Sequence, residues 1–388
     1  MITWRGGTVL SVGDSWAGAI TVSVRLDKPL PNVDLPGDVP ALVYPALVGQ
    51  PRVGARVVLN VSALARGLGT GGYALVVAFP DDLPDDPPAG PGHLVKARYT
   101  PLQAMVLGID EQESPHHEAL RAADSLGGLP VVVADLHSAL PAVIAGARLV
   151  DPQLRISYVM TDGGALPAWF SRSIGALREA EWLETVITVG QAFGGDHEAV
   201  SLHSGLLAAH HVLGADLVVV AQGPGNLGTG TAWGFSGVAA GEAINAVGAL
   251  EGRPIATLRV SGADQRARHR GISHHSLTAY SRVALASATV VVPDLRTARP
   301  YPAAEIDDSA IAGLHELAGQ VEQEVAQLIA PIGRHARADM GVDDLFRALH
   351  STPVRLSTMG RGLAQDPASF LAAAAAGKYA ALQVRSRP

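Results

Sequence analysis

Short apolar runs separated by glycine and proline fill the first part of the chain. The runs at residues 19–24 and 56–60 are rich in valine, and turn residues follow them at hairpin spacing. This rhythm predicts a small β-rich barrel or sandwich over residues 1–79. The next stretch, from Pro80 to Pro88, is acidic and proline-rich, so we predict a linker over residues 80–92.

A different pattern begins beyond the linker, where short apolar runs without alternation are separated by helical stretches. Such runs are typical of strands buried on both faces of a parallel sheet, and their spacing fits strand–helix–strand units. We predict an α/β domain over residues 93–300 with a doubly wound, mostly parallel sheet. Its strands are expected at residues 130–135, 156–160, 185–189, 216–221, 254–260 and 289–292.

The last part of the chain, residues 301–388, is predicted to be a helical extension. Apolar side chains recur at helical spacing from Ile311 to Leu328. Such a stripe favours packing, either on the α/β domain or on another subunit, over ligand binding. A homo-oligomer is therefore one of the two arrangements that we expect from this stripe.

Composition narrows the possible chemistry. The chain has no cysteine, which excludes disulfides, thiolate nucleophiles and cysteine-based metal sites. A net charge of −7 without a basic block argues against a nucleic-acid partner. No apolar run approaches the length that spans a bilayer, and the first residues lack the layout of a signal peptide. We therefore expect a cytoplasmic protein without a membrane partner.

Polar side chains and glycines follow five of the predicted strands. Because the carboxyl ends of parallel strands meet at one edge of a sheet, these residues are expected to form a binding or active site. The candidate acid–base residues are Asp162, His137, Asp196, Asp264 and His274. For Asp196, capping of the following helix is an equally good interpretation.

A glycine-rich segment follows the fourth strand. It matches the spacing of a dinucleotide-binding loop, but it opens the fourth strand–helix unit and no acidic residue ends the next strand at the expected distance. A cradle of backbone N–H groups for a phosphate or carboxylate is more plausible, and a purely structural turn is the alternative. The ligand-binding candidates here are Gly223, Gly225, Asn226, Gly228 and Thr229.

The loop after the fifth strand carries arginines and histidines. Arg266 and Arg268 are candidates for holding an anion, although a solvated charge run explains them equally well. Ser273 is a credible N-cap that places His274 and His275 in the first turn of a helix, where the helix end favours neutral imidazole. Adjacent helical residues diverge by about a hundred degrees, so at most one of the two histidines is expected to face a ligand.

Several of these segments resemble an uncharacterised bacterial family, the domain of unknown function 3866. The similarity runs from Trp4 to about residue 295. It is densest at residues 63–72, 98–101, 114–116, 136–138, 158–167, 191–199, 223–225 and 269–275. The resemblance implies membership of that family but no activity, cofactor or catalytic residue.

The favoured hypothesis is an enzyme that acts on a small anionic metabolite, bearing phosphate or carboxylate, with an Asp/His acid–base site at the strand ends. The alternative is a non-catalytic metabolite-binding or regulatory module that uses the same glycine-rich loops. The sequence assigns no cofactor. Carboxylates beside histidine leave a divalent metal open, without a defined set of ligands.

Overall fold

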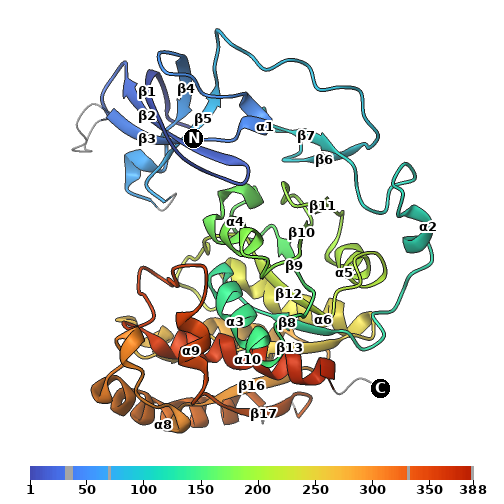
Figure 1. Ribbon diagram of the computed structural model, residues 1–388, viewed down its shortest axis with the longest axis vertical. Helices are drawn as coiled ribbons and strands as arrows, with labels where there is room; N and C mark the ends of the chain where they lie inside the picture. The colour runs from blue at the N-terminus through green and yellow to red at the C-terminus, as the bar shows by residue number, and fades with distance from the viewer. Residues whose placement is uncertain (31–37, 69–70, 330–332, 386–388) are drawn as a thin grey trace. The chain divides into compact units, whose positions relative to one another are not determined.

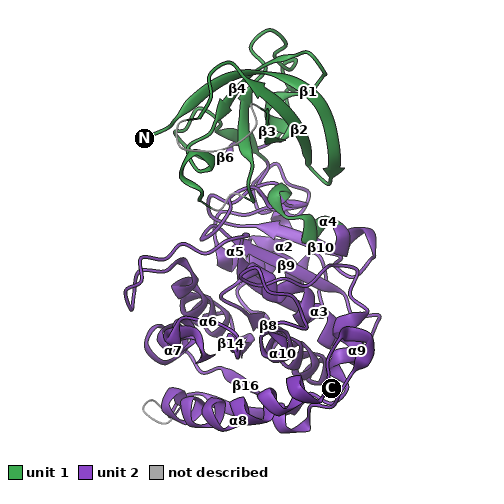
Figure 2. Cartoon of the chain, turned by 90° about the vertical axis from the view of Figure 1, so that its left-hand side faces the viewer, with its two compact units in different colours: residues 1–91, 95–106, 169–175 green, residues 92–94, 107–168, 176–388 purple. Residues whose placement is uncertain are grey.

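The computed structural model describes the chain except for residues 31–37, 69–70, 330–332 and 386–388. Its contacts divide the chain into two compact units, which Figure 2 shows in different colours. The first unit comprises residues 1–91, 95–106 and 169–175, and the second comprises residues 92–94, 107–168 and 176–388.

The first unit is built around a closed five-stranded barrel with the strand order β1–β2–β3–β5–β4. Its strands are β1 (Trp4–Trp16), β2 (Ala19–Leu26), β3 (Asp38–Val43), β4 (Arg56–Asn60) and β5 (Ala74–Ala78). Alternate side chains such as Val22, Val24, Val57 and Leu59 point inward and are buried, as the period of two along a strand requires. The predicted β-rich N-terminal fold is confirmed.

Smaller elements complete the segments around the barrel. They are α1 (Pro45–Val48), the 3₁₀ turn η1 (Leu64–Arg66), and the paired strands β6 (Leu94–Lys96) and β7 (Ala104–Val106). Residues 81–90, within the predicted linker, are exposed and have no helix or strand.

An eight-stranded parallel sheet forms the centre of the second unit (Figure 1). Its strands in chain order are β8 (Pro130–Val133), β9 (Ile156–Thr161), β10 (Thr185–Thr188), β11 (His197–Glu198), β12 (Leu217–Gln222), β13 (Arg253–Thr257), β16 (Thr289–Asp294) and β17 (Ala336–Gly341). Across the sheet they lie in the order β11–β10–β9–β12–β8–β13–β16–β17. The predicted parallel sheet is confirmed.

The direction of winding changes around β8, the first strand of this sheet in sequence. The chain adds β9, β10 and β11 toward one edge, returns with β12 beside β8, and then adds β13, β16 and β17 toward the other edge. In open parallel sheets ligands bind beyond the carboxyl ends of the strands at such a point. A ligand site is therefore expected beyond the carboxyl ends of β12, β8 and β13.

Helices cover both faces of the sheet (Figure 2). On one face lie α3 (Leu140–Val150), α9 (Leu345–His350) and α10 (Pro367–Arg385), with a run of buried alanines in α10 against α3. On the other face lie α5 (Leu202–His211), α6 (Ala239–Ala249) and α7 (His274–Thr278), which continues into the π-helical turn η6 (Ala279–Val283). Further helices are α2 (His117–Leu120), α4 (Arg172–Glu179) and α8 (Asp308–Ile329).

The remaining elements lie in the loops. They are the 3₁₀ turns η2 (His137–Ala139), η3 (Ala168–Phe170), η4 (Ser236–Val238), η5 (Ala267–His269), η7 (Leu295–Thr297) and η8 (Pro302–Ala304), and the antiparallel pair β14 (Val260–Ser261) and β15 (Gly271–Ile272).

The C-terminal extension is helical as predicted, but it also contributes β17, which pairs with β16 at the sheet edge. This strand, Ala336–Gly341, contains two charged residues, and all its positions are exposed or of intermediate burial. Because it has no apolar run, the sequence pattern did not predict it. The apolar stripe of α8, which includes Ile311, Val321 and Leu328, is buried within the second unit.

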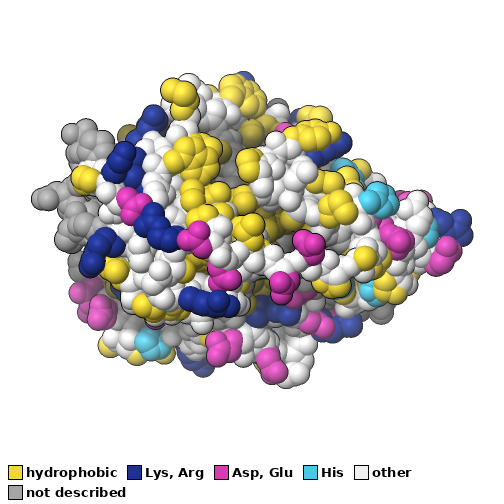
Figure 3. Space-filling model, turned by 90° about the horizontal axis from the view of Figure 1, so that it is seen from above, with side chains coloured by type: hydrophobic (Ala, Val, Ile, Leu, Met, Phe, Trp, Pro, Cys, Tyr) yellow, Lys and Arg dark blue, Asp and Glu magenta, His cyan; other side chains and the backbone are white. Residues whose placement is uncertain are grey.

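Charged side chains of both signs are interspersed on the face seen in Figure 3, in line with the absence of a basic block in the sequence. Within the described part of the chain, none of the helices combines the length and the apolar character needed to cross a membrane.

Candidate functional site

Eight polar side chains gather where β8, β12 and β13 end. We call them the strand-end cluster, and its members are Asp135, Gln222, Asn226, Thr257, Arg259, His269, His274 and His275. Gln222 and Thr257 are the last residues of β12 and β13, and Asp135 follows β8 by two residues. The remaining members come from the loops after β12 and β13, so segments far apart in sequence meet here.

Asp135 and Arg259 form the buried centre of the cluster. Their side chains are 4% and 9% exposed, and Oδ2 of Asp135 lies 3.7 Å from Nη1 of Arg259. The same oxygen lies 3.7 Å from Nδ1 of His275. The distance to Arg259 suits an ion pair, and both distances exceed hydrogen-bond length. The only hydrogen bond of the Arg259 guanidinium within the described chain goes to Nδ1 of His275, at 3.1 Å.

Amide side chains connect this centre to β12. Nε2 of Gln222 donates to the backbone oxygen of Asp135 at 2.8 Å. Oδ1 of Asn226 accepts from Oγ of Ser236 at 2.8 Å, which turns its Nδ2 toward Nδ1 of His275 at 3.3 Å. With donors of Asn226 and Arg259 both facing it, Nδ1 of His275 acts as an acceptor, which places the ring N–H on Nε2.

Four buried side-chain atoms in the described chain have no hydrogen-bond partner, and all four belong to the strand-end cluster. They are Oδ2 of Asp135, Oε1 of Gln222, Oγ1 of Thr257 and Nε2 of His274. A buried polar atom without a partner costs about 1–3 kcal/mol. Native proteins therefore keep such atoms where a ligand, a water or a reaction uses them.

Three imidazoles lie side by side at the edge of the cluster. One ring nitrogen of each of His269, His274 and His275 lies within 4.8 Å of the others. Burial, followed by nearby positive charge and neighbouring imidazoles, lowers the pKa of His269 to about 3 and of His274 to about 4. Both rings are therefore neutral at physiological pH.

The rings of His274 and His275 lie side by side, although adjacent residues of a helix generally point in different directions. The ring centroids of His274 and His275 are 4.4 Å apart. Both residues lie in the first turn of α7, where Ser273 caps the helix. The ring of His275 stacks on Phe235, with centroids 3.9 Å apart and planes 2° apart. This stacking holds one ring beside the other.

His137 lies at the end of β8 but faces the interior of the sheet. Its Nδ1 is 3.0 Å from the hydroxyl of Tyr158, which donates to the backbone oxygen of Gln222 at 2.9 Å. Burial lowers the pKa of His137 to about 4, although a hydrogen bond to the Gln222 backbone opposes this shift. These contacts give the predicted catalytic residue a role in connecting β8, β9 and β12.

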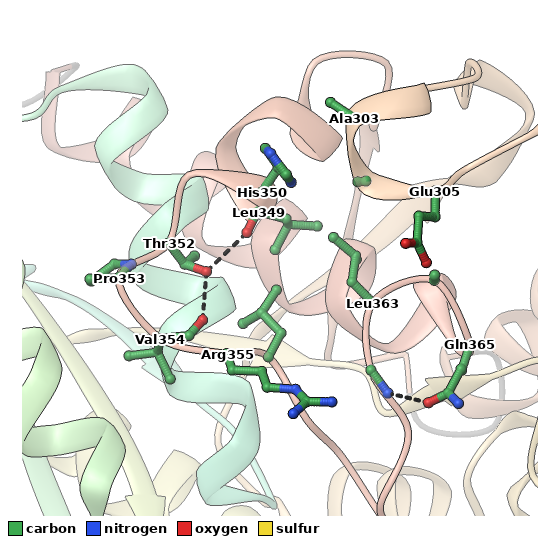
Figure 4. Close-up of a pocket in the computed structure, with 14 residues that line it drawn as sticks. Ala303, Glu305, Leu349, His350, Thr352, Pro353, Val354, Arg355, Leu363 and Gln365 are labelled. Atoms are coloured by element: carbon green, nitrogen blue, oxygen red, sulfur yellow. Dashed lines mark hydrogen bonds between the residues drawn. The ribbon is translucent and has the colours of Figure 1, made fainter.

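Two small cavities border Asp135. One, of about 30 Å³, is also lined by Thr257 and Arg259, and the other, of about 10 Å³, is also lined by Gln222. Each has room for about one water molecule. A larger cavity of about 520 Å³ lies among His350, Arg355 and Gln365 of the C-terminal extension (Figure 4), and none of the predicted site residues lines it.

Asp162 and Asp196 do not join the cluster. Asp162 is exposed beyond β9, where its Oδ2 accepts from the backbone N–H of Gln191 at 2.9 Å. Asp196 is exposed before the edge strand β11 and pairs with Arg178 at 2.9 Å. Nor does Asp196 cap α5, because Ser201 does so. Asp196 is far from β8 because β11 lies at the edge of the sheet. The sequence does not show this, because it does not give the order of the strands.

Asp264 is buried, but arginines occupy its carboxyl group. Arg266 contacts it at 2.8 Å and Arg361 at 3.2 Å. Hydrogen bonds from Arg266 hold the pKa of Asp264 well below its usual range. Asp264 thus anchors its loop to the C-terminal extension through Arg361, and Arg266 contacts the same carboxyl group from within the loop. Arg268 is exposed and makes no hydrogen bond or ion pair among the described residues.

The glycine-rich loop uses its own backbone groups. The N–H of Thr229 donates to Gly234, the N–H of Ser236 donates to Leu227, and Gly228 pairs with Phe235. Gly223 is buried against the carbonyl oxygen of Ala165, whereas Gly225, Gly228 and Thr229 are exposed. Of the ligand-binding candidates in this loop, only Asn226 reaches the strand-end cluster.

Six members of the cluster were not selected as candidates from the sequence, namely Asp135, Gln222, Thr257, Arg259, His269 and His275. Asp135, Gln222 and His275 stood among the residues that follow strands, but nothing distinguished them from their neighbours. Arg259 lay inside the run at residues 254–260, which was expected to be one strand. The structure ends β13 at Thr257, and the N–H of Arg259 donates to Oγ of Ser276 instead of a neighbouring strand.

A search of curated proteins found no match to the chain. A family model matches residues 40–377, which include every member of the strand-end cluster. The chain therefore belongs to the family described as protein of unknown function (DUF3866).

Proposed function

We propose that this protein is an enzyme that acts on a small anionic metabolite at the strand-end cluster. The observation that carries the proposal is the concentration of unpartnered buried atoms. Asp135, Gln222, Thr257 and His274 each hold one such atom, and these four are the complete set among the described residues. Folding alone gives no reason to gather them, since each lowers stability. Binding of a polar substrate does.

Arg259 is the proposed binding group for the anion. Its side chain is only 9% exposed, yet its guanidinium makes one hydrogen bond within the described chain. A guanidinium has five N–H donors in a planar fork that suits phosphate or carboxylate. Arg266 is less suited to this role because Asp264 already occupies its guanidinium.

Asp135 is the proposed proton-transfer group. Its carboxyl group is buried, has Oδ2 unpartnered, and borders two cavities that each have room for a water molecule. A carboxyl group within reach of a water or a substrate hydroxyl can accept its proton. The Gln222 amide and the Thr257 hydroxyl have hydrogen-bonding capacity to orient the same molecule.

The test of anion binding is thermal denaturation with increasing inorganic phosphate, followed by small phosphate esters and carboxylates. Wild-type protein should be stabilised, because a ligand that binds only the folded state raises the midpoint. Arg259→Gln should lose this stabilisation, whereas the exposed Arg268→Gln should keep it. Circular dichroism checks that both variants fold. Stabilisation retained by Arg259→Gln would exclude Arg259 as the anion-binding group.

Turnover separates the enzyme from the alternative, a non-catalytic metabolite-binding module. The compounds that stabilise the protein are incubated with it and followed by mass spectrometry. The enzyme proposal requires chemical conversion of at least one of them. Binding without conversion across the panel would favour the regulatory module, and absence of both would exclude the cluster as an anion site.

A further inference from the structure

We propose that His269, His274 and His275 together bind one divalent transition-metal ion. The inference does not depend on the proposed enzymatic function, because metal binding can be measured without any substrate. It concerns the edge of the strand-end cluster, where η5 ends and α7 begins.

The first argument is the position of the ring nitrogens. One nitrogen from each histidine lies within 4.8 Å of the other two. A tetrahedral zinc ion with Zn–N bonds of about 2.0–2.1 Å requires its ligand nitrogens to be about 3.3 Å apart. The present nitrogens are at most about 1.5 Å farther apart than a bound zinc ion requires, so binding involves a small approach of the three rings.

The second argument is the unpartnered nitrogen of His274. Its Nε2 is buried and has no hydrogen-bond partner in the part of the chain that the structure describes. A metal ion at this nitrogen would satisfy an atom that the protein leaves unsatisfied.

The third argument is the set of groups behind the other two rings. Nδ1 of His269 lies 2.7 Å from Oγ of Ser273, and this contact fixes the ring and leaves Nε2 to face the metal. Oδ2 of Asp135 lies 3.7 Å from Nδ1 of His275. Metal-bound histidines commonly donate their second nitrogen to such a hydroxyl or carboxyl group.

Binding requires one rearrangement at His275. Its Nδ1 now accepts from Arg259 at 3.1 Å. When Nε2 of His275 binds the metal, the ring proton moves from Nε2 to Nδ1 and is donated to Oδ2 of Asp135, 3.7 Å away. No proton leaves the site, and the Arg259 guanidinium is released to bind an anion.

The ligand set indicates the class of metal. Three imidazoles without a thiolate suit zinc, cobalt, nickel or copper rather than magnesium or calcium, which prefer oxygen. Three protein ligands also leave a position open for water or substrate, as in catalytic zinc sites.

The experiment uses the full chain after treatment with a chelator. Zn²⁺ is titrated by calorimetry, and Co²⁺ is followed by its visible spectrum. We expect one ion per chain with micromolar or tighter affinity. His269→Ala and His274→Ala should each weaken binding by about 100-fold or more, since even the groups behind the ligands contribute 10–100-fold. His211→Ala is the matched control, because His210 and His211 are also adjacent, with ring centroids 4.6 Å apart.

A second measurement remains informative if a variant misfolds. Wild-type protein is modified with diethylpyrocarbonate with and without Zn²⁺, and the tryptic peptide of residues 271–282, which contains His274 and His275, is quantified. Zn²⁺ should protect this peptide and leave His203 reactive. Absence of Zn²⁺ binding, or equal binding by the folded variants, overturns the metal site. Loss of phosphate binding alone would overturn the proposed function and leave the metal site intact.

Discussion

Oδ2 of Asp135 lies 3.7 Å from Nη1 of Arg259, both side chains are buried, and this oxygen has no hydrogen-bond partner among the described residues. Buried groups of opposite charge usually approach each other to hydrogen-bond distance, because a buried charge without a hydrogen bond lowers the stability of the folded protein. A water or ligand atom in the small cavity that both residues line could contact the two groups from the side.

Asp135→Asn should therefore separate function from stability. The amide has nearly the shape of the carboxyl group, and no side-chain hydrogen bond of Asp135 is lost. Loss of the charge 3.7 Å from Arg259 should lower the free energy of unfolding by less than about 3 kcal/mol, the lower end of the cost of breaking a hydrogen-bonded buried ion pair. Turnover of the substrate identified by the panel should fall by about 100-fold or more. Urea denaturation and steady-state kinetics measure the two quantities, and a large loss of stability with intact turnover would contradict this assignment.

Asp264→Asn should show the opposite behaviour. Arg266 and Arg361 both contact this buried carboxyl group, and removing one partner of a buried ion pair costs about 3–5 kcal/mol. Because the folded-state pKa is lowered, Asp264 stabilises the wild type above the unfolded pKa of about 3.9, and this stability is lost as pH falls further. Phosphate-induced stabilisation of the folded variant should persist. Its loss would return Asp264 to the list of functional residues.

His137 should make stability depend on pH between about 6.5 and 4. Burial lowers its pKa to about 4 in the folded state, whereas the unfolded chain protonates near 6.5. As pH falls through this window the unfolded state gains a proton that the folded state lacks, so stability decreases. His137→Gln should reduce the slope by up to about 1.4 kcal/mol per pH unit. The exposed His203→Gln is the control, and equal slopes for all three proteins would contradict the expectation.

Gly223→Ala should destabilise the folded protein for a steric reason. A Cβ there would collide with the backbone oxygen of Ala165, and overpacking of this kind costs about 1–3 kcal/mol. Gly313, on the exposed side of α8, has nothing within 4 Å of an added Cβ. Gly313→Ala should therefore raise stability by about 0.5–1 kcal/mol, as alanine does in a helix. Thermal denaturation of the two variants should give shifts of opposite sign.

The fold could be predicted from the sequence further than the site could. Valine-rich runs such as those that contain β8 and β12 predict buried strands, because successive side chains point to opposite faces of the sheet and both faces are buried. β17 was missed because an edge strand is partly exposed and tolerates charged residues. The strand predicted at residues 254–260 was too long. Its last part bends out of the sheet, and this bend is what brings Arg259 to the cluster.

By itself the sequence determined the two kinds of fold, most of the strands and the edge of the sheet where polar residues gather, because these follow from local patterns of burial and turn formation. Only the tertiary structure decided which of those residues meet. Strand order brings Asp135, Gln222 and Arg259 together and leaves Asp162 and Asp196 outside. Strand order depends on packing between segments that are distant in the chain, so local sequence patterns do not predict it.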